Sequence, residues 1–308
     1  MATHGIHDNA AIGITVPSVE ALVALRAEVS RHRPARRAQT LHTGTSLSPL
    51  RGRGMEYAES RDYVAGDDAR HIDWRLTART GRAHTKLYQA ETERLTVVLV
   101  DVSPSLFFGS KKRFKSVQAA RIAATAVWSA VRDGDRVGVI VPGIQSAPRR
   151  FATGLRGALP LMHVIADALR TPQPLDATAF ERQLLGLRKV LRHGARLVIV
   201  ADVHTVTAIA SEAWAQLAGV EVHVVLITDA LEQSPPAKTL PAQLENTRAV
   251  LALDQKPAAD RWQAHFSTPL AAFQDIARRT HVRVHVVQGD EAATAWLHTF
   301  HAAQAQVA

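Results

Sequence analysis

The 308-residue chain contains no cysteine. Disulfide scaffolds and cysteine-ligated zinc sites are therefore excluded, and the absence suits a reducing compartment. No apolar run reaches the length of about 18 residues that a membrane span needs. The amino-terminal residues MATHGIHDNA also lack the basic and then apolar pattern of a secretory signal. We therefore expect a soluble, cytoplasmic protein.

Aromatic residues are scarce at 5%, and the 28 acidic residues are outnumbered by 37 lysines and arginines, which gives a net charge of +9. Such an excess of positive charge raises the question of a nucleic-acid partner. The segment from Arg31 to Arg53 carries six arginines and no acid. It either docks on phosphates or is a solvated linker. We favour the linker, because the segment lacks the aromatic residues that would stack on bases.

Apolar runs of strand length alternate with helical patterns from residue 94 onward. Strands are expected at 95–100, 136–141, 196–201 and 220–227, with helices near 113–131, 155–169, 179–192 and 207–217, followed by the runs RAVLAL and HVRVHVV and an alanine-rich helix. This alternation, with continuously apolar strands, predicts a doubly wound α/β fold whose mostly parallel sheet is covered on both faces.

Three segments are expected along the chain. Residues 1–18 read as a flexible tail. Residues 19–93 hold a helix, the arginine-rich linker and a densely charged module that is expected to pack on the larger domain. The helix begins after Ser18 and places apolar residues at helical spacing to about Arg31. Residues 94–304 form the α/β domain.

Acidic residues follow three of the expected strands, at Asp101, Asp202 and Asp229. Because the carboxyl ends of parallel strands meet at one edge, where such folds bind ligands, these carboxylates should converge. Ser103 and Ser105 add hydroxyl oxygens beside Asp101. Carboxylate and hydroxyl oxygens are the ligands that Mg²⁺ or Mn²⁺ prefers. The alternative is that these residues form turns or cap helices, and nothing in the sequence distinguishes Asp229 from such a cap.

The sequence DVSPS at 101–105 resembles the DxSxS signature of von Willebrand factor A-like domains, whose metal-ion-dependent adhesion site holds Mg²⁺. That family adds a threonine and a second aspartate, which Thr178 and Asp202 match in position. The resemblance implies that Ser103, Ser105 and Thr178 bind the metal directly. It implies that Asp101 and Asp202 bind largely through water, and that one position stays open for a carboxylate from a partner.

This sequence departs from the adhesion-site pattern at two positions. Ala177 stands where the family usually has glycine, and Ala201 stands where serine is common. Because Ala177 directly precedes Thr178, the threonine is the ligand that the departures affect most.

Upstream, the sequence GDDARHIDW at 66–74 is similar to a motif of the bacterial family called domain of unknown function 58, in which it precedes a von Willebrand A-like fold. The resemblance covers roughly residues 45–230. It implies a protein partner, since members are often associated with MoxR-type AAA+ ATPases that remodel or mature other proteins. The chain has no G-x-x-x-x-G-K-[ST] phosphate loop, so we expect a non-enzymatic protein whose partner supplies any ATP hydrolysis.

The charged residues of this motif have two interpretations. They are Arg61, Asp67, Asp68, Arg70 and Asp73, with Trp74 directly after them. One interpretation is a buried or semi-buried ion-pair network that fastens the module to the sheet, with Trp74 and Tyr63 packed beneath it. The other is a docking surface or a second metal site. We favour the structural interpretation, because so short a segment cannot bury a core alone.

Two further functions compete with metal-dependent binding. The first is a Mg²⁺-dependent hydrolase or phosphatase with Asp101 as nucleophile, although Ser103 stands where the general acid would be needed. The second is a basic nucleic-acid-binding protein, although no helix-turn-helix, zinc-finger or RNA-binding signature is present. His281 and His285 lie four apart on an expected strand, and without an evident third ligand they read as polar-face residues.

Overall fold

The computed structural model describes residues 13–32, 55–64, 66–90, 94–143, 151–174, 177–244 and 247–298. The chain divides into two compact units, one formed by residues 1–38 and 94–308 and the other by residues 39–93. Most of the expected tail and of the Arg31–Arg53 segment lies outside the described residues. Among the described residues, no helix has both the length and the apolar character to cross a membrane.

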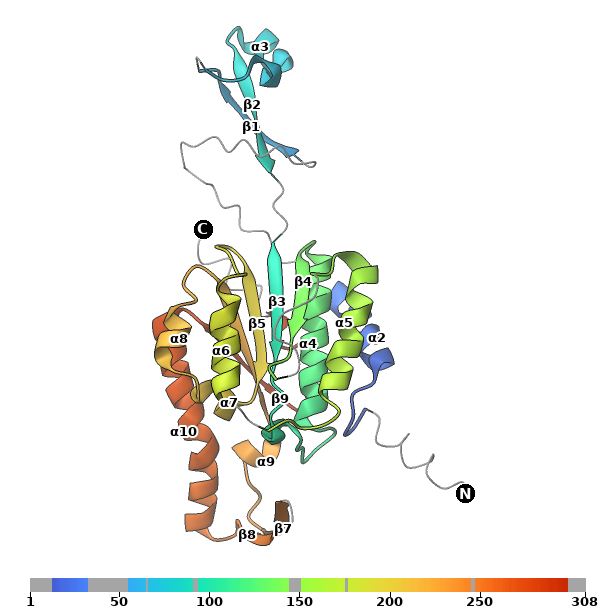
Figure 1. Ribbon diagram of the computed structural model, residues 1–308, viewed down its shortest axis with the longest axis vertical. Coiled ribbons are helices and arrows are strands. Elements are labelled where there is room, and N and C mark those ends of the chain that lie inside the picture. The colour runs from blue at the N-terminus through green and yellow to red at the C-terminus, as the bar shows by residue number, and fades with distance from the viewer. Residues whose placement is uncertain are drawn as a thin grey trace, which may run out of the picture. The chain divides into compact units, whose positions relative to one another are not determined.

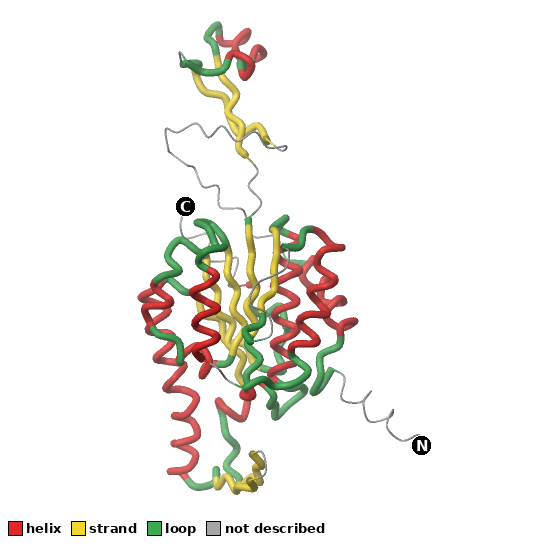
Figure 2. Tube along the Cα trace, viewed as in Figure 1, coloured by secondary structure: helices red, strands yellow, loops and turns green. Residues whose placement is uncertain are grey.

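The larger unit is built on one parallel sheet of five strands. In spatial order the strands are β4 (Arg136–Ile140), β3 (Leu95–Val100), β5 (Arg196–Ala201), β6 (Glu221–Thr228) and β9 (Arg283–Gln288). All four neighbouring pairs are parallel. Helices cover both faces, as Figures 1 and 2 show. The predicted doubly wound α/β fold is thereby confirmed.

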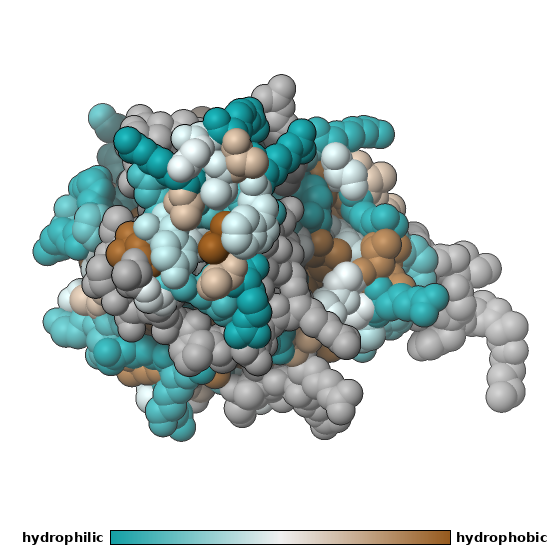
Figure 3. Space-filling model, turned by 90° about the horizontal axis from the view of Figure 1, so that it is seen from above, coloured by the Kyte–Doolittle hydropathy of each residue, from teal (hydrophilic) through white to brown (hydrophobic). Residues whose placement is uncertain are grey.

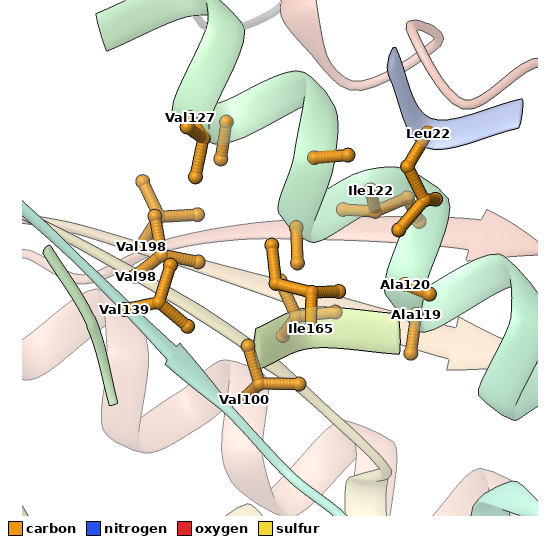
Figure 4. Close-up of a cluster of buried hydrophobic side chains, with 14 of the residues drawn as sticks. Leu22, Val98, Val100, Ala119, Ala120, Ile122, Val127, Val139, Ile165 and Val198 are labelled. Carbon is orange, nitrogen blue, oxygen red and sulfur yellow. The ribbon is translucent and has the colours of Figure 1, made fainter. Parts of the chain in front are cut away.

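Alternate residues of each strand enter the two apolar layers. Val98 and Val100 of β3 pack on one side, and Val97 and Leu99 pack on the other. The first layer is covered by α2 (Val19–Ser30), α4 (Lys115–Arg132) and α5 (Gly154–Ala168). The second is covered by α6 (Ala177–Leu187), α7 (Val203–Thr207), α8 (Ser211–Ala215) and α10 (Lys256–Thr280). Figure 4 shows valines of the sheet beneath α4 in the first layer.

Helix α2 begins and ends where the sequence predicts, with the Ser18 side chain accepting a hydrogen bond from the Ala21 amide at its start. Its buried leucines pack against α4, and the Trp128 indole donates to the Leu22 carbonyl oxygen at 2.9 Å. The sequence groups this helix with the residues up to 93, whereas the structure places it in the unit that holds the sheet.

Three segments differ from the sequence expectations. The helix expected near 207–217 is instead the two short helices α7 and α8, and the run at 248–253 forms β8 (Thr247–Ala252). β8 pairs with β7 (Thr239–Leu244) in an antiparallel hairpin that is separate from the parallel sheet. The 25-residue helix α10 was not predicted. Figure 1 shows α9 (Ala230–Gln233), the hairpin and the start of α10 beyond the carboxyl ends of the strands.

The smaller unit is an antiparallel hairpin of β1 (Met55–Asp62) and β2 (His84–Ala90). Its connection contains the short 3₁₀ helix η1 (Ala69–His71) and α3 (Trp74–Thr80). Two large apolar side chains of this unit, Val64 and Trp74, are exposed. Figure 3 shows one face of the molecule, on which hydrophilic side chains in teal are interspersed with hydrophobic ones in brown.

Candidate functional site

The predicted carboxylates lie at a topological switch point of the sheet. After β3 the chain first forms β4 on one side, and it then crosses to form β5 on the other side of β3. Sheets with this strand order bind ligands outside the carboxyl ends of the two strands that flank the reversal. Asp101 follows β3 and Asp202 follows β5. The two residues meet there, because the Asp202 amide donates to Asp101 Oδ2 at 3.1 Å.

The Asp101 carboxylate is buried, with 3% of the residue exposed. Ser103 donates to it twice, from its amide at 2.8 Å and from its hydroxyl at 3.0 Å. Thr205 adds a hydroxyl donor at 2.6 Å. Burial raises the pKa of Asp101, and the hydrogen bonds from Thr205, Asp202 and Ser103 oppose that rise. The carboxylate is therefore surrounded by neutral donors, with no basic side chain among its hydrogen-bond partners in the described part of the chain.

The two serine hydroxyls of the DxSxS sequence lie side by side. Ser103 Oγ and Ser105 Oγ are 3.0 Å apart. In an octahedral Mg²⁺ shell with bonds of about 2.1 Å, neighbouring ligand oxygens are about 3.0 Å apart. Among the described residues no group of three or more His, Cys, Asp or Glu side chains is arranged to hold a metal. A cation at this edge must therefore draw on hydroxyl oxygens, and the donor set of Asp101, Ser103 and Ser105 fits one.

A cavity of about 150 Å³ opens beside this cluster. It is lined by Asp101, Val102, Ser103, Pro142, Gly143, Gln173, Pro174, Ala179 and Phe180. Pockets for drug-sized ligands measure about 300–1,000 Å³, so this cavity suits a small ion or a single carboxylate.

The two threonines near the site differ from expectation. Thr178 lies exposed in the first turn of α6, and its neighbour Ala179 lines the cavity. Its role as a ligand stays a prediction. Thr205, which the sequence did not single out, is buried and donates to Asp101. The sequence feature that could have identified Thr205 is a hydroxyl residue three positions after Asp202, in the first turn of the helix that follows a strand.

Asp202 is engaged by a buried lysine that sequence reasoning missed. Lys115 Nζ lies 2.7 Å from Asp202 Oδ2 and 2.5 Å from Glu232 Oε1. The other oxygen of Asp202 accepts the His204 amide at 2.9 Å, where it caps α7. Burial acts to lower the pKa of Lys115, but the two carboxylates outweigh burial and raise it.

Asp229 is a helix cap, the role that the sequence left open. Its side chain accepts the Leu231 amide at 2.9 Å, and Glu232 returns the contact by accepting the Asp229 amide at 2.8 Å. This reciprocal capping box fixes α9. The Ser110 amide also donates to Asp229, at 2.8 Å. Asp229 thus holds α9 and the loop before α4 together.

A comparison with family models identifies the chain's relatives. The model described as "Protein of unknown function DUF58" matches residues 59–255, well over half of the chain. The chain belongs to this family. The DUF58 match includes the charged motif of the smaller unit and the candidate site residues from Asp101 to Glu232, and it ends directly before α10. Helix α2 and strand β9 lie outside it.

The DUF58 chain has relatives among curated proteins. It is 32% identical over 163 residues to an uncharacterized protein of Mycobacterium bovis and to uncharacterized proteins of two Mycobacterium tuberculosis strains. Each alignment covers 52% of this chain and 50% of the relative. The chain therefore spans about half the length of the curated relatives it matches.

Two solved structures are similar to the DUF58 chain. Both are of the PilB minor pilin from Streptococcus sanguinis, with a TM-score of 0.42 at 10% identity for one and of 0.40 at 8% identity for a mutant. Each similarity covers 74% of this chain and 65% of the pilin.

In the smaller unit, the charged motif of this DUF58 chain forms caps and local pairs. Arg61 pairs with Asp67 at 2.7 Å, and Asp67 also accepts the Val64 amide at 3.0 Å. Asp68 caps η1 and pairs with the exposed Arg70 at 3.2 Å. The Arg61–Asp67 pair is semi-buried and the Arg70–Asp68 pair is largely exposed, so the motif holds no fully buried pair among these contacts. That the motif fastens the module to the sheet stays a prediction.

Asp73 caps α3, accepting the Leu76 amide at 3.1 Å and the Ser60 hydroxyl at 3.2 Å. The expectation that Trp74 packs beneath the motif is wrong, since Trp74 is 69% exposed at the first position of α3. Tyr63 is half-buried and donates its hydroxyl to the Asp67 carbonyl oxygen at 3.2 Å. A docking role for this motif stays a prediction.

A second polar cluster lies at the opposite, amino edge of the sheet in this DUF58 chain. Arg94 and Arg196 both pair with Asp133, Asp135 and Glu221. Arg196 is almost fully buried at 1% exposure.

Two histidines extend this amino-edge cluster. His223 hydrogen-bonds Glu221 at 3.1 Å, and His285 stacks on His223 with ring centroids 5.3 Å apart. Arg283, the first residue of β9, also pairs with Glu221, at 2.9 Å. The expected polar-face pair of His281 and His285 is therefore wrong: His285 is buried, and His281 ends α10 before β9 begins.

Proposed function

We propose that this DUF58 protein is a non-enzymatic protein-interaction module that binds Mg²⁺ or Mn²⁺ at the carboxyl edge of its sheet. Asp101, Ser103 and Ser105 would hold the cation, with Asp202 and Thr178 as the further ligands that the resemblance to adhesion sites implies. When bound, the cation supplies a positive coordination position that accepts a carboxylate from a partner protein. The resemblance also implies the kind of partner, a MoxR-type AAA+ ATPase or its client.

One observation carries this proposal. A buried carboxylate and two adjacent hydroxyl oxygens, 3.0 Å apart, lie at the switch point of the sheet. Asp101 and Ser103 also border a cavity of about 150 Å³. Because neutral donors surround Asp101, no basic side chain among its described hydrogen-bond partners neutralises its negative charge. Oxygen ligands of this kind suit a hard divalent cation.

The geometry disfavours the phosphatase alternative. A nucleophilic carboxylate must present a free oxygen to the phosphorus atom. Both oxygens of Asp101 instead accept hydrogen bonds: Oδ2 accepts the Asp202 amide and the hydroxyls of Ser103 and Thr205, and Oδ1 accepts the Ser103 amide. Ser103, two residues after Asp101, supplies no acidic proton at the pH of the cell.

The test begins with Mn²⁺ alone. Electron paramagnetic resonance counts free Mn²⁺ during titration of wild type, Asp101→Asn and Ser103→Ala, with the exposed Asp275→Asn as a matched control. We expect one Mn²⁺ per chain in wild type and in the control. Loss of a contact that supports a metal ligand typically weakens metal binding about 10- to 100-fold, and we expect at least this loss for the two site variants. Equal binding by wild type and Asp101→Asn would refute the cation site.

The partner is tested separately by affinity capture with a purified MoxR-type ATPase. We expect wild type to retain it in Mg²⁺, and to release it in EDTA. Asp101→Asn should fail to retain it in either buffer. Retention of the ATPase in EDTA would show that the two proteins associate without the cation.

A further inference from the structure

Lys115 is a fully buried cation next to the proposed metal site. It is the first residue of α4, and 1% of it is exposed. Its ammonium contacts Asp202 at the end of β5 and Glu232 in α9, at 2.7 and 2.5 Å. Three elements that are far apart in sequence therefore meet at one nitrogen.

Asp202 links the lysine to the Asp101 cluster. The backbone of Asp202 donates to the Asp101 carboxylate, while the side chain of Asp202 points to Lys115. The second oxygen of Asp202 is taken by the His204 amide. Both oxygens of the carboxylate that adhesion-type sites use for a cation are thus already bonded within the chain.

Resting on the proposed function, we propose that Lys115 is a positioning residue that keeps Asp202 as its ion-pair partner and thereby withholds this carboxylate from direct coordination of the divalent cation, so that Asp202 acts on the cation only through water. The cation then depends on Asp101, Ser103 and Ser105, and its affinity is set lower than a site with two available carboxylates would give. Like charges repel, so the ammonium also opposes a second cation nearby.

A purely structural role for Lys115 makes a different prediction. If the lysine only anchors α9 to the sheet, every substitution in the trio loosens the fold, and metal binding either falls or stays unchanged. If it withholds Asp202, removal of the lysine strengthens metal binding. The sign of the change in Mn²⁺ affinity therefore separates the two roles.

The decisive variant is the double substitution Lys115→Met with Glu232→Gln. With all three groups charged, the wild-type trio carries a net charge of −1 from two carboxylates and one ammonium. The double variant carries the same net charge, on Asp202 alone. It avoids the two unpaired carboxylates of Lys115→Met, which are expected to impair folding. It also frees Asp202 without changing the total charge.

Glu232→Gln alone is the opposite control. It leaves Lys115 with Asp202 as its only charged partner among the described contacts, which tightens that ion pair. We expect Mn²⁺ to bind about tenfold more tightly to the double variant than to wild type, and more weakly to Glu232→Gln. Unfolding in urea with and without Mn²⁺ checks that both variants are folded. It also shows whether Mn²⁺ stabilises the double variant more than wild type.

Each remaining outcome decides something. If the double variant binds Mn²⁺ no more tightly than wild type, while Asp101→Asn abolishes binding, the inference is refuted and the cation site stands. If the double variant binds Mn²⁺ and wild type does not, Lys115 replaces the cation in the native protein, which supports the inference and refutes the proposed function. If none of them binds Mn²⁺, both proposals fall.

Discussion

The two edges of the parallel sheet bury charge in different ways. At the amino edge, Arg94 and Arg196 face Asp133, Asp135 and Glu221, so basic and acidic groups largely compensate each other. At the carboxyl edge, Lys115 likewise compensates Asp202 and Glu232, but neutral hydroxyl and amide donors alone surround Asp101 among the described contacts, and a cavity opens beside it.

Buried charges that are paired with opposite charges leave no net charge for a ligand to neutralise. A buried carboxylate that accepts hydrogen bonds only from neutral donors keeps its negative charge, which a bound cation can neutralise. The amino edge is therefore expected to serve stability, and the carboxyl edge binding. Substitutions at the two edges should have correspondingly different effects.

The largest loss of stability is expected at the amino edge. Arg196→Met would leave Asp133, Asp135 and Glu221 with one arginine fewer, and breaking a buried pair typically costs about 3–5 kcal/mol. Urea unfolding measures the change. The control is Arg278→Met, which removes an exposed arginine and should cost little. Similar losses for the two variants would contradict the contrast between compensated and surface charge.

Acid should weaken the amino edge through its histidines. Burial lowers the pKa of His223 from 6.5 to about 4, against the opposing hydrogen bond to Glu221. Burial also lowers the pKa of His285, to about 3, with further lowering by His223 and Arg283. As the pH falls, both imidazoles are protonated at a higher pH in the unfolded chain than in the folded chain. The stability they contribute is complete above pH 6.5 and is lost as the pH falls toward 4.

The slope is small near pH 7 and approaches a limit of about 1.4 kcal/mol per pH unit for each histidine well below pH 6.5, once the unfolded imidazole is fully protonated. Urea unfolding at pH 7, 6 and 5 measures it, and His285→Gln should flatten it. Burial raises the pKa of Asp101 and Glu232, and these groups contribute with the opposite sign. Their contribution is the same in wild type and in His285→Gln, so it cancels when the slope of the unfolding free energy against pH is compared between the two. Equal slopes would show that His285 does not sense pH in this range.

A smaller loss is expected at the carboxyl edge from Thr205→Val, which removes one of the hydrogen bonds to Asp101. Because Ser103 and the Asp202 amide remain as donors, we expect a cost of about 1 kcal/mol. Mn²⁺ affinity should fall as well. Thr207→Val, whose hydroxyl bonds only helix carbonyls in the described structure, is the matched control, and an equal fall in its Mn²⁺ affinity would contradict a role for Thr205.

The smallest effect is expected from Thr178→Ala. The residue is exposed, so stability should change by no more than about 0.5 kcal/mol. If Thr178 is a ligand, Mn²⁺ affinity falls, and less than in Ser105→Ala, because Ser105 already lies beside Ser103. An unchanged affinity would remove Thr178 from the ligand set.

Strong local patterns made most of the fold predictable from sequence. The apolar runs at 95–100 and 196–201 fall on β3 and β5 without error, because strands buried on both faces need continuous Val, Ile and Leu. Helix α10 was missed, since Pro269 lies inside it and much of its surface is polar. Its buried contacts are few, notably Phe273 and Ala277, and tertiary packing supplies the stability that the local pattern does not indicate.

The candidate site was predictable only where its residues follow strands. Asp101, Ser103 and Asp202 come directly after β3 and β5, so their convergence follows from parallel pairing. Lys115 follows two lysines and an arginine at 111–113, and in the sequence it looks like part of a solvated basic loop. Its burial depends on Glu232, 117 residues away, and no local pattern reports that contact.

The insertion of residues 39–93 between α2 and β3 also affects the order of folding during synthesis. The Trp128 indole that binds the Leu22 carbonyl oxygen is made 106 residues after it. At about 5–20 residues per second, α2 waits about 5–20 s for this partner. Strands β1 and β2 pair across a much shorter loop and can form their hairpin meanwhile. Helix α2 thus stays undocked while the residues up to Trp128 are made, and until α4 appears its apolar face is available to chaperones.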